Sequence, residues 1–236
     1  MVDTDAPLSP AEAGKRAAAA RAVEMVEDGM TLGLGTGSTA KWFLVLLAES
    51  GKRVTSVPTS SQTEAHAIEL GIPVSTLAET GQLDLTVDGA DEFDGAMNLI
   101  KGGGGALLQE KIVAAASAKM VVISDSSKEV ATLGAYDLPV EIVRFGWEAT
   151  LAHISTCLGE QDVSGHGATL RGQDAPYVTD EGHFIVDLAL GRIGDPASLN
   201  RDLNVIPGVV ETGLFCDLAD VVIVGHADGT ARVIGG

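Results

Sequence analysis

Short apolar runs alternate with longer stretches of helical character through the first 125 residues of the chain. In the short runs, aliphatic residues recur at every second position or stand in a row, which predicts half-buried or fully buried strands. The longer stretches are rich in good helix formers. Strands are predicted at 31–35, 54–60, 72–77, 83–88, 97–101 and 119–125, and helices at 10–27, 38–49, 60–71 and 106–119. This alternation is typical of an α/β fold built on an open, Rossmann-like, mostly parallel sheet.

The pattern changes after residue 134, where an order of β-α-β-β-α-β is predicted. Its strands are expected at 138–146, 176–180, 183–190 and 209–215, with a turn at 181–182, and its helices at 147–159 and 195–206. That order indicates a split βαβ, ferredoxin-like unit. We therefore expect a smaller α+β domain at 135–207 and a main catalytic α/β domain at 1–134 plus 208–236. The strands predicted at 219–225 and 231–234 are expected to return to the sheet of the main domain.

The composition agrees with this fold class. Hydrophobic residues make up 45% of the chain but aromatic residues only 4%, so the core is built from Ala, Val, Leu and Ile, as suits parallel strands covered by helices. The longest clear apolar run, WFLVLLA, is much shorter than the roughly 18 residues of a membrane span. The acidic N-terminus MVDTDAPLSPAEAGKR lacks the apolar segment of a secretory signal, and Cys157 and Cys216 show no motif spacing. A cytoplasmic chain without a disulfide framework is expected.

The net charge of −18, from 33 acidic and 15 basic residues, makes nucleic acids and anionic membranes poor partners. The acidic residues are spread along the chain, which indicates a solvated acidic surface with few lysines. Such a surface is expected of a halophilic protein, since the Debye length falls to about 3 Å at about 1 M salt and self-repulsion is then screened.

The first glycine turn, residues 33–39 (GLGTGST), joins a predicted strand to a predicted helix and forms a candidate anion site. A dinucleotide site fits badly, because Ser38 stands where the fingerprint has glycine and no acidic residue follows the next strand. A Walker A loop is excluded by the lack of Gly-Lys-Ser/Thr. The interpretation as a single-phosphate site stands beside a purely structural one, a tight turn with Ser38 or Thr39 as N-cap.

The second glycine turn, residues 102–105, follows Lys101 and precedes the predicted helix at 106–119. Four glycines in a row permit left-handed backbone and close approach to a ligand. With Lys101 beside them, their N–H groups could hold an anion or a developing oxyanion. A flexible loop without function is the alternative.

Carboxylates gather around this turn: Asp88, Asp91, Glu92 and Glu110. Each alone is most simply a solvated or dipole-complementing residue, but together, beside a lysine and two anion loops, they are candidate acid–base groups. Glu110 lies roughly 200° around the helix from Leu108 and Ile112, so we expect it to lie off the buried stripe and to face a cleft.

The histidines show no spacing typical of metal ligands, and we predict no metal site. No Gly-x-Ser-x-Gly motif occurs, so a serine hydrolase is not supported.

At these residues the chain resembles the ribose-5-phosphate isomerase A family. GLGTGSTA, VDGADE, IKGGGGALLQEKI, SDSSK, LPVEI, VTDEG and IPGVVETGLF stand in the family's order and span nearly the whole chain. The resemblance implies an open α/β domain with a small α+β domain and a homodimer or homotetramer. It also implies a sugar phosphate partner: D-ribose 5-phosphate and D-ribulose 5-phosphate are interconverted through an enediolate, with no metal or organic cofactor.

The resemblance also implies roles for individual residues. Glu110 resembles the enolising base, Asp88 the carboxylate that assists ring opening and proton shuttling, and Lys101 the group that stabilises the enediolate. Asp91 is implied as a further polar residue of the site. The implied substrate-binding positions are Lys15, Thr36, Gly37, Ser38, Thr39, Asp88, Gly89, Ala90, Asp91, Lys101, Gly102, Gly103, Gly104 and Lys128. Gly105 departs from relatives that carry alanine there, and we expect it to loosen the loop slightly.

Two other functions are open to a chain of this fold. One is a sugar-phosphate sensor module, although only about 30 residues precede the first predicted strand and the charge is wrong for DNA. The other is a CoA transferase-like enzyme that would form a covalent adduct at Glu110 and leave Lys101 without a role.

Overall fold

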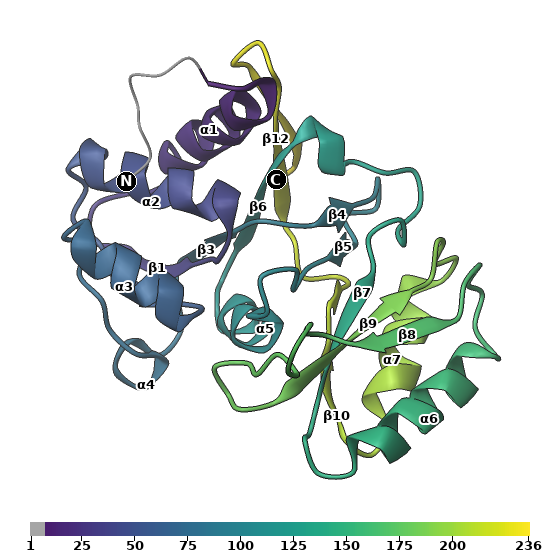
Figure 1. The fold of residues 1–236 in the computed structure, drawn as a ribbon. Helices are drawn as coiled ribbons and strands as arrows, with labels where there is room; N and C mark the ends of the chain where they lie inside the picture. Colours follow the sequence, from purple (N-terminus) through teal and green to yellow (C-terminus); the bar gives the residue numbers. More distant parts are fainter. Residues whose placement is uncertain (1–7) are drawn as a thin grey trace.

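A computed structural model describes residues 8–236, and its largest element is a six-stranded sheet of order β13-β12-β6-β3-β1-β2 (Figure 1). All neighbouring strands are parallel except β12 and β13. The strands are β1 (Thr31–Leu34), β2 (Thr55–Pro58), β3 (Leu85–Asp88), β6 (Met120–Asp125), β12 (Val221–Gly225) and β13 (Ala231–Gly235). β6 and β12 are buried along their whole lengths, as expected of aliphatic strands covered on both faces.

The helices form layers on the two faces of this sheet. They are α1 (Pro10–Val23), α2 (Ser38–Ser50), α3 (Ser61–Glu69), α4 (Leu77–Thr80) and α5 (Leu107–Ala115), with a 3₁₀ turn η1 (Ser126–Lys128). Alternate residues of β6 point to opposite layers: Val121 and Ile123 join the core beneath α1 and α2, whereas Val122 packs in the cluster that holds Ala114 of α5. Figure 1 shows α5 on the side of the sheet away from α1 and α2.

Helix α1 lies unusually close to β12 because two glycines meet there. A Cβ on Gly225 would lie 1.8 Å from the carbonyl oxygen of Gly14, and one on Gly14 would lie 2.9 Å from that of Gly225. This contact fixes the position of the next residue of α1, Lys15, against the end of the sheet.

A second sheet, of order β10-β7-β9-β8, is wholly antiparallel. It comprises β7 (Leu138–Ile142), β8 (Gly167–Leu170), β9 (Phe184–Ala189) and β10 (Val209–Thr212), and the helices α6 (Trp147–Leu158) and α7 (Pro196–Asn204) pack on it around a separate apolar core. The predicted fold class, a mostly parallel sheet with a smaller α+β part of split βαβ type, is confirmed.

A third, three-stranded sheet of order β11-β5-β4 links the two larger sheets. It consists of β4 (Glu92–Phe93), β5 (Leu99–Ile100) and β11 (Leu214–Phe215). The second glycine turn leaves β5 and enters α5, so it lies between the parallel and the antiparallel sheets.

The strand predicted at 176–180 is wrong. The hairpin partner of β9 is β8 at Gly167–Leu170, and the 171–183 loop between them crosses to the main sheet side (Figure 1). There Asp180 accepts hydrogen bonds from the amide and hydroxyl of Ser61, and Glu181 accepts one from Gln109. The residues of this segment bind another part of the chain instead of pairing in a ladder.

Two further strand predictions need correction. The predicted strand at 209–215 is two strands in different sheets, because the chain turns at Gly213, where a Cβ would lie 2.3 Å from the carbonyl oxygen of Lys101. The predicted strand at 72–77 contributes only one isolated bridge, Ser56 to Val74, before α4 begins.

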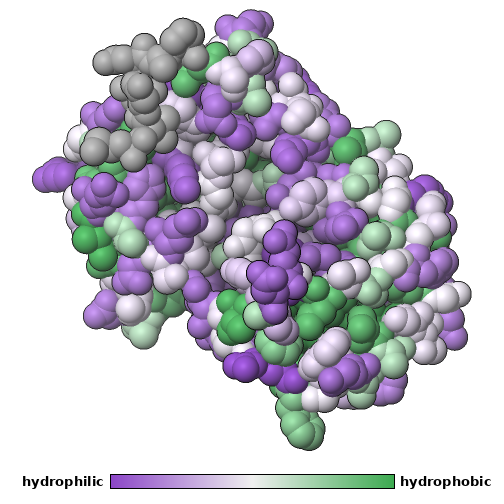
Figure 2. Space-filling view, viewed as in Figure 1, coloured by the Kyte–Doolittle hydropathy of each residue, from purple (hydrophilic) through white to green (hydrophobic). Residues whose placement is uncertain are grey.

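The division into domains at 134 and 207 stays a prediction, and β10, at Val209–Thr212, lies beyond the second boundary although it belongs to the antiparallel sheet. Part of the N-terminal segment on which no secretory signal was predicted, residues 1–7, lies outside the described residues. Within residues 8–236, no helix is long and apolar enough to cross a membrane. Figure 2 shows hydrophilic side chains over much of the visible face, with apolar ones gathered over the antiparallel sheet.

Candidate active site

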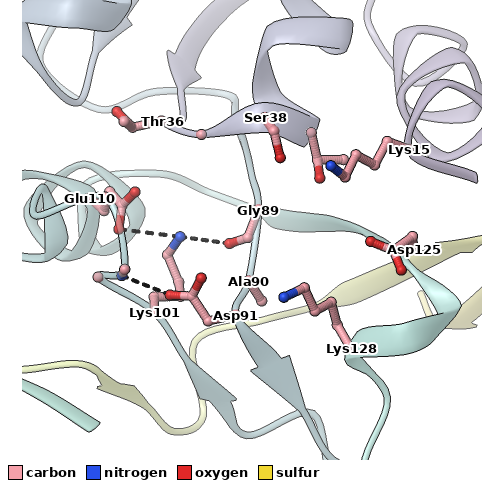
Figure 3. Close-up of a pocket in the computed structure, with 15 residues that line it drawn as sticks. Lys15, Thr36, Ser38, Gly89, Ala90, Asp91, Lys101, Glu110, Asp125 and Lys128 are labelled. Carbon is pink, nitrogen blue, oxygen red and sulfur yellow. Dashed lines mark hydrogen bonds and ion pairs between the residues drawn. The ribbon is translucent and has the colours of Figure 1, made fainter. Parts of the chain in front are cut away.

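A polar cavity of about 170 Å³ lies at the carboxyl ends of β1, β3 and β6, the edge at which parallel α/β sheets bind ligands (Figure 3). Both glycine turns contribute to its wall. The lining residues are Lys15, Thr36, Gly37, Ser38, Thr39, Gly89, Ala90, Asp91, Lys101, Gly102, Gly103, Gly104, Glu110, Asp125 and Lys128.

Three buried charged groups meet at one end of this cavity. The Lys101 ammonium lies 3.0 Å from Oδ2 of Asp88 and 3.3 Å from Oε2 of Glu110, and it donates a hydrogen bond of 2.6 Å to the carbonyl oxygen of Gly89. The three side chains are between 0% and 5% exposed. Neither of these two carboxylate oxygens has a well-directed hydrogen bond, so they interact with the ammonium chiefly through charge.

This arrangement shifts all three pKa values. Burial raises the pKa of Glu110 to about 8, and the charge of Asp88 adds to the effect while Lys101 opposes it. Burial also raises the pKa of Asp88, again against the pull of Lys101. Burial lowers the pKa of Lys101, but the two carboxylates outweigh it, so the net pKa is raised and the ammonium stays charged. A carboxyl group that titrates near neutrality beside a fixed cation is suited to take up and return a proton.

Asp88 lies behind the cavity wall and does not line it. It is fully buried, and its Oδ1 accepts hydrogen bonds from the amides of Gly89 at 2.7 Å and Thr36 at 3.1 Å. The first glycine turn passes directly over this carboxylate, since a Cβ on Gly35 would lie 2.0 Å from Oδ1. Gly35 is therefore required by Asp88, not by a ligand.

Asp91 faces the cavity and also holds the second glycine turn. Its Oδ2 accepts a hydrogen bond of 2.8 Å from the amide of Gly103. A Cβ on Gly103 would lie 2.8 Å from Oδ1 of Asp91 and 2.3 Å from the hydroxyl of Tyr136, so no side chain fits there. Gly102 has a φ of 102° and Gly105 one of 82°, both in the left-handed region that favours glycine.

The other end of the cavity, called the electropositive end below, carries two ammonium groups and one carboxylate, that of Asp125, whose Oδ1 accepts hydrogen bonds from the amide and hydroxyl of Ser127. Helix α2 begins there at Ser38 with Gly37 as its N-cap, and no side chain caps it, so its first amides remain available to an anion. Lys15 and Lys128 also line this end, and Figure 3 shows both on the side of the cavity away from Glu110.

The Lys15 side chain is held in place by a short chain of polar contacts. Its ammonium lies 2.7 Å from Oε1 of Glu12, whose Oε2 accepts a hydrogen bond of 2.7 Å from the indole of Trp42. Burial opposes the shift, but the hydrogen bond from Lys15 dominates and the pKa of Glu12 is lowered. Glu12 is thus an ionised anchor that aims Lys15 at the α2 terminus.

Thr36 lines the cavity but its polar groups are engaged elsewhere. Its hydroxyl lies 2.8 to 2.9 Å from the hydroxyls of Thr59, Ser60 and Thr63, and its amide donates to Asp88. Figure 3 shows the hydroxyl turned away from the other labelled side chains.

The structure brings every site residue named from the sequence to this cavity except Asp88, which stands directly behind it. Glu92, grouped with the carboxylates from the sequence, lies apart: its two oxygens accept hydrogen bonds from the amides of Gly134 and Tyr136.

The prediction that Glu110 lies off a buried stripe through Leu108 and Ile112 is wrong. Ile112 is 49% exposed, and the buried face of α5 holds Glu110 itself with Leu107 and Val113. Glu110 reaches the cavity because that buried face meets the charged cluster.

Sequence analysis missed one residue at the electropositive end of the cavity, Asp125, and three residues around the second glycine turn. Asp125 lines the cavity, and Tyr136, Arg171 and Tyr177 contact the glycines from outside it. The expectation that Gly105 loosens the loop is not supported, since its Cβ position is filled by Tyr177, 2.3 Å away. The signal available in the sequence was the SDSSK motif for Asp125; the other three stand in no motif.

No group of three or more His, Cys, Asp or Glu side chains suited to a metal ion occurs within residues 8–236. The prediction of a reaction without metal or organic cofactor stays a prediction.

Comparison with known proteins gives the same family at each level. The family model described as ribose 5-phosphate isomerase A (phosphoriboisomerase A) matches residues 55–229. The ribose-5-phosphate isomerase A of Cereibacter sphaeroides is 58% identical over 230 residues, covering 95% of this chain and 92% of its own. The protein of the same name from a Ruegeria species is 56% identical over 231 residues, covering 96% and 88%.

Solved structures agree over the whole fold. A D-ribose-5-phosphate isomerase in complex with phospho-erythronic acid superposes with a TM-score of 0.89 at 38% identity, covering 97% of this chain and all of that one, 100%. The ribose 5-phosphate isomerase from Plasmodium falciparum gives a TM-score of 0.87 at 36% identity, covering 95% and 99%.

Proposed function

The chain belongs to the ribose-5-phosphate isomerase A family, and we propose from this premise how its residues carry out the reaction. It is an aldose–ketose isomerase that interconverts D-ribose 5-phosphate and D-ribulose 5-phosphate. The reaction removes the proton on C2 of the open-chain aldose, passes through an enediolate and returns a proton to C1.

The substrate phosphate binds at the electropositive end of the cavity. The uncapped amides at the start of α2 and the ammonium groups of Lys15 and Lys128 support this assignment. The hydroxyls of Ser38 and Thr39 complete the phosphate site, whereas Thr36 supports the turn from behind. Binding energy at the phosphate then holds the sugar with C1 and C2 at the opposite end.

Glu110 is the base that transfers the proton between C2 and C1. As a carboxylate it takes the C2 proton, and as a neutral acid it returns that proton to C1, so its charge is restored after each turnover. Its buried position at the cavity wall and its pKa of about 8 support this role, because a base that titrates near the working pH transfers a proton most effectively.

Lys101 balances the charge that forms during this transfer. As Glu110 becomes neutral, a negative charge appears on the enediolate. The Lys101 ammonium, paired with the Glu110 carboxylate before the transfer, is then paired with the enediolate. The amide of Gly104 adds a hydrogen-bond donor at this end, since no acceptor for it occurs among the described residues.

The two aspartates have different roles. Asp91 lines the cavity and is the carboxylate that contacts the sugar hydroxyls, assists ring opening and moves the hydroxyl proton from O2 to O1. Asp88 is enclosed behind the wall, so it acts through Lys101, which it orients, and through its charge, which keeps the pKa of Glu110 high.

One observation carries this assignment: a buried, titratable Glu110 paired with Lys101 forms the wall of a cavity whose far end is built to bind an anion. The test incubates D-ribose 5-phosphate with the protein in D₂O, with and without EDTA. We expect ketose formation with deuterium entering at C1 of the ketose and at C2 of the aldose, and EDTA should have no effect. For Glu110→Gln we expect a loss of at least about 10³-fold in kcat.

The matched control is Glu148→Gln, because Glu148 also lies in the first turn of a helix but is exposed. It should keep wild-type activity. Wild-type activity in Glu110→Gln would remove Glu110 from its role, and EDTA sensitivity would show that a metal takes part.

The sensor and CoA transferase-like alternatives are not favoured, because relatives matching over 95% of the chain or more are named as the isomerase. A CoA transferase would also leave Lys101, enclosed between two carboxylates, without a function.

We also propose a homodimer or homotetramer that functions in the cytoplasm. Phe145 is 92% exposed and Val205 75% exposed, and the backbone bond from Val143 to Gly208 joins the two segments that carry them. Large apolar side chains exposed in this way favour an interface. Light scattering on the purified protein tests the assembly, and a monomer at micromolar concentration would refute it.

The acidic surface supports a further proposal, adaptation to high salt. With a net charge of −18, the folded chain should be more resistant to unfolding in molar salt than in low salt. Equal stability in both would refute it.

A further inference from the structure

The second glycine turn is held from outside the cavity by Arg171, a residue next to the antiparallel sheet that has no part in the mechanism above. The guanidinium donates from Nη1 to the carbonyl oxygen of Gly102 at 2.9 Å and to that of Gly103 at 3.3 Å. Arg171 follows directly after β8, 68 to 69 residues along the chain from these glycines.

A carbonyl group that is held determines where the next amide points. In a trans peptide the C=O and the following N–H lie on opposite sides of the chain. With the oxygens of Gly102 and Gly103 turned toward Arg171, the N–H groups of Gly103 and Gly104 point the other way. The hydrogen bond from the Gly103 amide to Asp91, a residue of the cavity wall, agrees with that direction.

The guanidinium is itself fixed. It forms a bidentate pair with Asp187 of β9, through Nε at 2.8 Å to Oδ2 and through Nη2 to Oδ1. Its side chain is 17% exposed, and the ring of Tyr177 lies 5.9 Å from it while the Tyr177 hydroxyl fills the space beside Gly105. Arg171 therefore binds Asp187 of β9 with Nε and Nη2, and its Nη1 binds the carbonyl oxygens of Gly102 and Gly103.

We propose that Arg171 is a positioning residue of the isomerase: it orients the second glycine turn so that the Gly104 amide binds the oxygen on which the enediolate charge develops. This inference rests on the proposed function of Glu110 and Lys101 at the same end of the cavity. It makes the antiparallel sheet a part of the catalytic apparatus, although no residue of that sheet lines the cavity.

Donors aimed at a developing oxyanion act in the transition state far more than in the ground state. Loss of the orienting contact should therefore lower kcat and leave the phosphate interaction intact. The first variant is Arg171→Met, which keeps the aliphatic volume and removes all donors. Its control is Arg192→Met, because Arg192 also forms a bidentate pair with an aspartate, Asp162, through its two terminal nitrogens, but contacts neither glycine turn.

We expect kcat of Arg171→Met to fall about 10- to 100-fold, with KM for D-ribose 5-phosphate within about threefold of wild type. Inhibition by phospho-erythronic acid should weaken at least about tenfold, because this acid carries a carboxylate in addition to its phosphate. Inhibition by inorganic phosphate should be unchanged. Arg192→Met should match the wild type in all three.

A second variant separates the carbonyl contacts from the ion pair. Asp187→Asn leaves Arg171 free to bind the glycine carbonyls, so its kcat should fall less than that of Arg171→Met. If Arg171→Met does not fold, Arg171→Lys replaces it: its single ammonium pairs with the carboxylate of Asp187 and cannot also hold the two glycine carbonyls, so the same kcat loss is expected at constant KM.

The inference is overturned if Arg171→Met, or Arg171→Lys in its place, keeps kcat within twofold of the Arg192→Met control. It is also overturned if phosphate inhibition weakens as much as phospho-erythronic acid inhibition, or if Asp187→Asn equals Arg171→Met. None of these outcomes would refute the proposed function. The proposed function is refuted if the wild-type protein does not isomerise the sugar or if Glu110→Gln is active.

Discussion

The two glycine turns look alike in the sequence but are built in different ways. In the first, glycines are required by neighbouring strand β3: a Cβ would lie 2.1 Å from Oγ1 of Thr86 at Gly33 and 2.0 Å from Oδ1 of Asp88 at Gly35. In the second, the glycines are held by Asp91 on one side and by Arg171 of the other sheet on the opposite side. The first turn thus belongs to the packing of the main sheet, and the second is oriented for the reaction.

The difference extends to the charges beside each turn. The first turn meets the cavity with uncapped amides and lies near Lys15, whose partner Glu12 is partly exposed. The second encloses Lys101 with two buried carboxylates, one of which has a pKa of about 8. Buried charge of this kind lowers stability and is retained where activity needs it. Changes in the first turn should therefore affect stability, and changes in the second should affect activity.

Among changes in the two glycine turns, the largest expected effect is that of Gly103→Ala in the second turn. The new Cβ would lie 2.3 Å from the Tyr136 hydroxyl and 2.8 Å from Asp91, so the turn must move and its amides lose their direction. We expect kcat to fall at least about 10²-fold. Gly95→Ala is the control, because Gly95 does not line the cavity and nothing lies within 4 Å of its Cβ position. Steady-state kinetics check this, and equal kcat values in the two variants would contradict it.

Next in size is the effect of Gly35→Ala in the first turn. Its Cβ would lie 2.5 Å from Cα of Asp88, so two paired strands must separate. We expect a loss of about 2 to 3 kcal/mol in the free energy of unfolding by urea. Gly95→Ala, where nothing lies within 4 Å, is expected to change it by less than about 0.5 kcal/mol. If Gly35→Ala kept full stability, the first turn would not be a packing element.

A smaller effect of opposite sign is expected for Glu110→Gln. Because the pKa of Glu110 is raised from 4.5 to about 8 in the folded state, the folded protein binds more protons than the unfolded one between these values. The contribution of this group to the free energy of unfolding is fully present below about pH 4.5 and is lost as the pH rises to about 8. We expect Glu110→Gln to be more stable than wild type by about 2 kcal/mol at pH 9, and the gain to shrink as the pH falls toward 5.

Chemical denaturation of both proteins at several pH values measures this difference. Glu148→Gln serves again as the exposed control and should show no such gain. If Glu110→Gln were no more stable than the wild type at pH 9, burial of the charged Glu110 carboxylate would not lower the stability of the folded protein.

The sequence predicted the parts of this site that depend on short-range patterns. Strand, glycine turn and helix follow one another within about ten residues at each turn, so Ser38, Lys101 and Glu110 could be placed at the edge of a parallel sheet. The split βαβ order was equally readable, because each element has its own apolar period.

The sequence did not predict the contacts between residues that are far apart along the chain. Arg171 and Tyr177 contact the second glycine turn across about 70 residues, and neither stands in a recognisable motif. A strand was predicted at 176–180 because the composition of this segment is strand-like. In the structure Asp180 binds α3, and Tyr177 binds the second glycine turn. The face of α5 was misjudged for a related reason: periodicity assigns charged residues to the outside, and Glu110 is buried against a lysine from another element.

The geometry that underlies the account is tested most directly by a crystal structure of this chain with phospho-erythronic acid. We predict that the phosphate binds the first amides of α2 between Lys15 and Lys128, and that the carboxylate lies near Lys101 and the amide of Gly104, within about 3 to 3.5 Å of Glu110. A phosphate bound at Lys101 and the second glycine turn, with the acid group toward α2, would contradict the account.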